Sequence, residues 1–152
     1  MEFVKCYNFP SKYANEDVLK KIKILFVCVE NSCRSQMAEG WARAYSEDIF
    51  EVYSSGSKPS GKVNETALLL MREKNIDLSL HRSKSLSEIP QVRWDYVVTM
   101  GCGDACPFVL AKTKIDWKIP DPKAFPIEKF REIRDLIETK VQELLVHAKE
   151  KI

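Results

Sequence analysis

The sequence predicts a single α/β domain in which helices lie on both faces of a four-stranded parallel sheet. Two observations carry this prediction: short apolar runs alternate with longer segments of helical periodicity, and no linker, repeat or low-complexity tract divides the 152 residues. Parallel strands that are joined through helices need right-handed crossovers. A chain of this length forms one domain by size and buries a substantial core.

Four short runs have the composition of strands. The first, over 23–29, is almost continuously apolar, which is typical of a buried strand. The second and third cover 51–54 and 96–100, and a weaker run covers 114–118. We expect these four runs to form the sheet.

Helical periodicity fills the intervals between the strands. It covers 36–47 after the first strand and 64–74 after the second, where three positions are expected to point inward: Leu68, Leu69 and Met71. The last helix covers 128–149, and its apolar stripe predicts core packing through Phe130, Ile133, Ile137, Val141, Leu144 and Leu145.

Residues 1–20 stand apart as an N-terminal extension without an assigned role, and 21–152 form the expected domain. The N-terminus lacks a basic stretch followed by an apolar core, and no apolar run approaches eighteen residues, so neither a secretion signal nor a membrane partner is predicted. We expect a cytoplasmic protein, whose five cysteines serve catalysis rather than structural disulfides. A net charge of +2 with interspersed signs argues against a nucleic-acid partner.

The most informative segment is a strand-to-helix turn, Cys28-Val29-Glu30-Asn31-Ser32-Cys33-Arg34-Ser35. The unpaired backbone N–H groups of residues 29–35 and the helix dipole are suited to cradle a tetrahedral oxyanion. The same groups, with Arg34 close by, favour the thiolate form of Cys28, and the hydroxyl of Ser35 can stabilise it. We therefore predict that Cys28 is a nucleophile and that Cys33 shapes the turn. The alternative, a buried strand-end cysteine beside a solvated Arg34, leaves the small polar residues of the turn unexplained.

A second pair of thiols follows the third strand. Cys102 and Cys106 lie four positions apart between glycines and a proline. A disulfide needs Cα atoms about 4.4–6.8 Å apart, so the segment must coil to close one, which suggests a switch that closes on oxidation. Half of a zinc site is an alternative, but the chain has no second close cysteine pair and no paired-histidine motif. Unrelated loop cysteines are another alternative.

Asp121 is the third candidate. Pro122 biases it to an extended conformation that can hold its carboxyl group in a pocket, where the protonated acid could donate to a leaving oxygen. Ligands of a doubly wound sheet bind beyond the carboxyl ends of the strands. Because Cys28, Cys102 and Asp121 follow different strands, we expect them to converge on one crevice.

The segment 24–40 resembles the signature of the low-molecular-weight tyrosine phosphatase fold, and specifically of its arsenate reductase branch. Segments 95–107 and 117–122 resemble the redox-cysteine segment and the general-acid loop of that branch. The resemblance runs from about residue 21 to the C-terminus. It implies arsenate reduction, with catalytic roles for Cys28, Arg34, Cys102, Cys106 and Asp121.

The resemblance also implies thioredoxin as the reductant. The interval between Cys102 and Cys106 is shorter than in the thioredoxin-coupled members, which leaves glutaredoxin or a small thiol as alternatives. Glu39 matches a residue associated with a potassium site in some members, but the stretch 82–84 is unsuited to complete one, so no metal and no cofactor are predicted.

Two other functions remain open. A low-molecular-weight protein tyrosine phosphatase would use the same turn and Asp121, since phosphate and arsenate share charge and shape, although it needs no second thiol. A thiol protein that binds arsenite or senses redox state would need no turnover.

Overall fold

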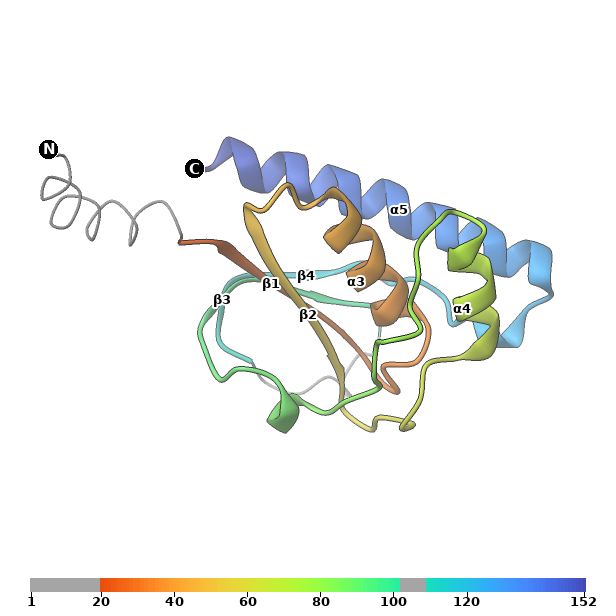
Figure 1. Cartoon of the computed structure of the whole chain (residues 1–152). Helices are drawn as coiled ribbons and strands as arrows, with labels where there is room; N and C mark the ends of the chain where they lie inside the picture. Colours follow the sequence, from red (N-terminus) through yellow and green to blue (C-terminus); the bar gives the residue numbers. More distant parts are fainter. Residues whose placement is uncertain (1–19, 102–108) are drawn as a thin grey trace, which may run out of the picture.

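The computed structural model describes residues 20–101 and 109–152. Four strands form one parallel sheet: β1 (Ile22–Cys28), β2 (Phe50–Gly56), β3 (Trp94–Thr99) and β4 (Ala111–Asp116). Their order across the sheet is β2-β1-β3-β4, as Figure 1 shows. The predicted α/β class and the four-stranded parallel sheet are confirmed.

β1 occupies the interior of the sheet because its residues are apolar on both faces. It pairs with β2 on one side and β3 on the other, and residues 24–28 are all buried. The register places Cys28 opposite Gly56 and Val27 opposite Thr99. The chain segments that follow these three strands therefore leave the sheet at the same edge.

β4 begins three residues earlier than the sequence pattern predicts. It is an edge strand, paired only with β3 among the described strands, and Lys112 and Lys114 are exposed on it. These lysines interrupt the apolar pattern from which a strand is predicted. The strand ends at Asp116, and Lys118 beyond it has a φ of +53°.

Three α-helices gather on one face of the sheet: α3 (Arg34–Tyr45), α4 (Glu65–Arg72) and α5 (Ile127–Glu150) (Figure 1). The opposite face is covered by a smaller apolar cluster that includes Leu86 of the 3-10 helix η1 (Leu86–Glu88) and Ile89 after it. Among the described residues, the three α-helices thus lie on one face, and the other face carries only the three-residue η1 and neighbouring chain segments. Within the described residues, none of the helices has the length and apolar character that a membrane span requires.

The predicted core positions are correct for α5 and partly wrong for α4. All six apolar residues of the α5 stripe are buried. In α4, Leu69 is 51% exposed whereas Leu70 is fully buried. Ala67, Leu70 and Met71 share the inward face because residues three and four apart lie on one side of a helix. Leu69 points away from that face.

Candidate active site

The turn between β1 and α3 has the strand-to-helix form that the sequence predicts. Cys28 is the last residue of β1, and Arg34 is the first residue of α3. Asn31 has a φ of +52°, in the left-handed region that asparagine tolerates better than most residues. The turn also lies tightly against Gly56, where an added Cβ would come within 2.5 Å of the Val29 oxygen.

Replacement of Gly56 with alanine is expected to displace the turn, because its Cβ would also lie 2.9 Å from the backbone nitrogen of Asn31. We expect a loss of about 1–3 kcal/mol of stability from overpacking and weaker binding of orthophosphate. Thermal unfolding and titration calorimetry measure the two effects. Ser60→Ala, which removes an exposed hydroxyl group, is the control. Unchanged phosphate affinity in Gly56→Ala would contradict the prediction.

The carbonyl oxygens of the turn are held from outside by the segment 57–64 and by Ser83. The Ser83 hydroxyl donates to the backbone carbonyl oxygen of Glu30 at 2.8 Å. Four backbone N–H groups also donate to carbonyl oxygens of the turn: Ser57 to Cys28, Lys58 to Val29, Ser60 to Glu30 and Asn64 to Ser32. In residues 20–101 and 109–152, the N–H groups of Ser32, Cys33 and Arg34 have no protein acceptor. Such a turn is arranged to donate to a bound anion.

The Cys28 thiol has two polar neighbours. Its Sγ lies 2.9 Å from Ser35 Oγ and accepts from the backbone N–H of Asn31 at 3.3 Å. Because the Asn31 side-chain amide donates to Ser35 Oγ at 2.8 Å, the hydroxyl hydrogen of Ser35 is left for the sulfur. The Asn31 N–H group and the Ser35 hydroxyl group thus both contact Cys28 Sγ.

Asn31 holds the turn through every polar atom of its side chain. Its Nδ2 donates to Ser35 and to Ser54, and its Oδ1 accepts from Gln36 Nε2 and from the backbone N–H of Lys84. A fully satisfied buried amide fixes the geometry of the groups around it. This network ties α3, β2 and the segment before η1 to the thiol.

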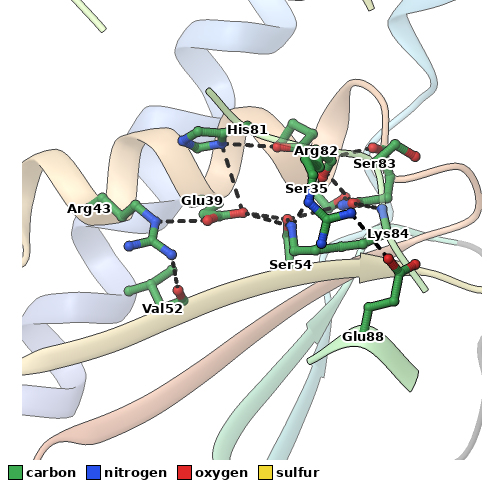
Figure 2. Close-up of polar contacts among 12 residues, drawn as sticks. Ser35, Glu39, Arg43, Val52, Ser54, His81, Arg82, Ser83, Lys84 and Glu88 are labelled. Carbon is green, nitrogen blue, oxygen red and sulfur yellow. Dashed lines mark hydrogen bonds and ion pairs between the residues drawn. The ribbon is translucent and has the colours of Figure 1, made fainter. Parts of the chain in front are cut away.

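The network continues to a buried carboxylate, which Figure 2 shows between His81, Arg43 and Ser54. Glu39 accepts from Ser54 Oγ at 2.5 Å and from Arg43 Nε at 2.7 Å, and Lys84 Nζ lies 3.7 Å from its Oε1. Burial lowers the pKa of Lys84 and of His81, and the nearby Glu39 opposes both shifts. Lys84 and His81 thus face the Glu39 carboxylate from the segment before η1.

Arg34 is anchored by backbone carbonyls from two other strand ends. Its Nη1 donates to the oxygen of Met100, after β3, at 2.8 Å and to the oxygen of Ile119, after β4, at 2.9 Å. Its Nη2 lies 4.0 Å from a carboxylate oxygen of Asp121. The guanidinium group is thus fixed where the segments after three strands meet.

A cavity of about 250 Å³ brings the predicted residues together. Its lining comes from the turn and from the segment after β4: Cys28, Val29, Glu30, Ser32, Cys33, Arg34, Asp121 and Lys123. Asp121 also caps the 3-10 helix η3 (Pro122–Ala124), since its Oδ1 accepts from the backbone N–H of Lys123. Cys28 and Asp121 therefore meet at one cavity, together with Arg34, whereas Cys102, the third residue expected there, lies outside the described residues.

The other two predicted catalytic residues, Cys102 and Cys106, lie outside the described residues, as do Cys6 and the rest of 1–19. Met100, two residues before Cys102, contacts Arg34 through its carbonyl oxygen. The described part of the chain therefore passes beside Arg34 just before this segment.

Cys33 differs from Cys28 in its electrostatics. It is buried as the N-cap residue of α3, and burial raises its pKa to about 12. A thiol with this pKa stays protonated at neutral pH. This agrees with a role for Cys33 in shaping the turn.

Sequence reasoning missed several residues that support the site. Ser54, Gln36 and Lys84 reach Asn31 from separate elements, and Lys123 lines the cavity from η3. Only Lys123 had a signal, since it follows the Asp121-Pro122 pair by one residue. The others depend on strand register and on contacts between distant segments.

Comparison with known proteins identifies the family. The family model for low-molecular-weight phosphotyrosine protein phosphatase matches residues 23–152. Arsenate reductase 2 of Staphylococcus epidermidis is 39% identical over 128 residues, which cover 82% of this chain and 96% of that protein.

Solved structures agree with this relationship. An arsenate reductase in the phosphate-binding state has a TM-score of 0.75 and 35% identity, with 83% of this chain and 98% of that one covered. A thioredoxin-dependent arsenate reductase of Corynebacterium glutamicum has a TM-score of 0.72 and 29% identity, with coverage of 99% and 73%. The chain belongs to the low-molecular-weight phosphotyrosine protein phosphatase family.

Proposed function

We propose that the protein is an arsenate reductase that converts arsenate to arsenite through a covalent adduct on Cys28 and a thiol relay through Cys102 and Cys106. The observation that carries the proposal is the cavity in which the Cys28 thiol, the Arg34 guanidinium and the Asp121 carboxyl group meet. The similarity to arsenate reductases over most of the chain supports the choice of substrate.

The first step forms a sulfur–arsenic bond. Arsenate binds against the N–H groups of the turn and Arg34, and the Cys28 thiolate attacks arsenic. One arsenic–oxygen bond breaks, and Asp121 gives a proton to the departing oxygen, which leaves as water. Arsenic is still in the +5 state in this adduct.

The second step transfers two electrons. The Cys102 thiolate attacks Cys28 Sγ, a disulfide forms between them, and the sulfur–arsenic bond breaks with its electron pair left on arsenic, which departs as arsenite. Cys106 then attacks Cys102, so that Cys28 is released as a thiolate and the disulfide joins Cys102 to Cys106. A dithiol reductant of the thioredoxin type returns both sulfurs to thiols. Such a cycle suits the cytoplasm, where thiols are kept reduced.

Arsenite production with each reductant in turn tests the proposal. We expect multiple turnovers with thioredoxin or glutaredoxin, and mass mapping of the enzyme stopped before reduction should find the Cys102–Cys106 disulfide. A stoichiometric single burst with every reductant would instead indicate an arsenite-binding or redox-sensing protein.

The family relationship also supports a second candidate, a protein tyrosine phosphatase that forms a phosphocysteine at Cys28. Simultaneous replacement of Cys102 and Cys106 with alanine separates the two functions. The reductase proposal requires this variant to lose arsenate turnover and to keep any hydrolysis of phosphate esters. A wild-type protein that hydrolyses phosphotyrosine but forms no arsenite would favour the phosphatase.

A further inference from the structure

An ion pair crosses the surface between the turn and the segment that carries Asp121. Lys123 Nζ contacts the carboxylate of Glu30, although the two residues lie 93 positions apart in the chain. The Ser32 hydroxyl donates to the same Glu30 oxygen at 3.5 Å. The hydrogen bond to Glu30 raises the pKa of Lys123, so the ammonium group stays charged at neutral pH. The chemistry proposed above requires none of these side-chain contacts.

The pair stands between two hollows of the surface. On one side lies the cavity of about 250 Å³ that contains Cys28. On the other lies a groove of about 410 Å³ lined by Ser60, Lys62, Asn64, Glu65 and Thr66. Three residues line both: Glu30, Ser32 and Lys123. Their side chains therefore form a wall that the cavity and the groove share.

Such a wall can separate inorganic oxyanions from phosphate esters, which the turn by itself cannot do. Backbone N–H groups and a guanidinium recognise the charge and the tetrahedral shape that arsenate, orthophosphate and phosphate esters have in common. An ester differs by the organic group on one oxygen, which needs space beyond the oxyanion cavity. The groove offers that space on the far side of Glu30 and Lys123.

Because their charges are opposite, Glu30 and Lys123 have different effects on anion binding. The Glu30 carboxylate lies beside a site for anions and would repel them if it were unpaired, whereas the Lys123 ammonium neutralises it. Loss of Lys123 alone therefore leaves a repulsive carboxylate in place. Loss of Glu30 alone removes part of the wall and frees a cation.

We propose that the Glu30–Lys123 ion pair is a specificity-determining wall that closes the oxyanion cavity to organic phosphate esters and reserves it for small inorganic oxyanions. The inference rests on the proposed arsenate reductase function, because it explains how a phosphatase-type site would be restricted to an inorganic substrate.

The test compares ester hydrolysis with oxyanion binding in the full-length protein. For each variant, kcat/KM for p-nitrophenyl phosphate is divided by the association constant for orthophosphate from calorimetry. We expect Glu30→Gly to raise this ratio about tenfold, the size of a typical steric discrimination in a pocket, and Glu30→Gln to raise it less. Lys123→Met should weaken orthophosphate binding about threefold, since a partly exposed ion pair contributes up to about 1 kcal/mol.

Two further variants serve as a rescue and as a control. The reversed pair, Glu30→Lys with Lys123→Glu, rebuilds the wall and should return the ratio toward the wild-type value. Lys129→Met removes one partner of an exposed pair with Glu132 on α5 and should leave the ratio unchanged. Circular dichroism checks that each variant is folded.

An unchanged ratio in folded Glu30→Gly, or a reversed pair that behaves like Glu30→Gly, would overturn the proposal. Neither readout involves arsenate or a reductant. Failure of the wild-type protein to form arsenite would therefore refute the proposed function without deciding the role of the wall.

Discussion

Replacement of Cys28 with serine is expected to reduce arsenite formation by at least about 10³-fold, as removal of a catalytic nucleophile does in other enzymes. A serine hydroxyl is not ionised at neutral pH, and its oxygen can form neither the sulfur–arsenic bond nor a disulfide with Cys102. The smaller Oγ still fits beside Ser35 Oγ and the Asn31 N–H group, so the turn should keep its shape. Initial rates of arsenite release measure the loss.

Orthophosphate binding and Cys33→Ala provide the controls for this experiment. The serine variant should still bind orthophosphate, because the N–H groups and Arg34 are unchanged. Cys33→Ala should lose less than about tenfold in rate, because Cys33 is a protonated thiol whose pKa burial raises to about 12. More than a tenth of wild-type arsenite formation in Cys28→Ser would contradict the assignment of the nucleophile.

Replacement of Arg34 with lysine is expected to lower kcat/KM for arsenate by about 10²–10³-fold, the cost of losing one aligned donor to a charged transition state. A single ammonium group cannot donate to the carbonyls of Met100 and Ile119 and also present a planar edge to an oxyanion. Steady-state kinetics and orthophosphate titration measure the change.

The same substitution at Arg131, which pairs with Glu73 on the surface, is the matched control and should have little effect on kcat/KM. If Arg34→Lys retained more than a third of the wild-type kcat/KM, the guanidinium geometry would not be needed for catalysis.

Local sequence patterns were sufficient to predict the strands and helices of the interior. The continuous apolar run of β1 and the stripe of α5 are governed by burial, which sequence periodicity reports directly. The pattern failed at β4, where exposed lysines of an edge strand hide the alternation. It also failed at Leu69 of α4, because the five consecutive apolar residues of 67–71 give no unique face.

The candidate site could be predicted only where its residues are contiguous or follow parallel strands. The turn of residues 28–35 and the convergence with Asp121 come from these two rules. The bond between Asn31 and Ser54 could not be predicted, since it depends on the pairing of β1 with β2. The anchoring of Arg34 could not be predicted either, because every residue has a backbone carbonyl and the sequence does not mark the two that accept from Arg34.

That anchoring links the geometry of the candidate site to the assembly of the whole sheet. The two carbonyls that hold Arg34 belong to the chain just after β3 and just after β4, and β4 is the edge strand farthest from β2. A chain in which β1, β2 and α3 have assembled but β4 has not docked lacks the second of these anchors. The position of the Arg34 guanidinium beside Cys28 therefore depends on the docking of the last strand.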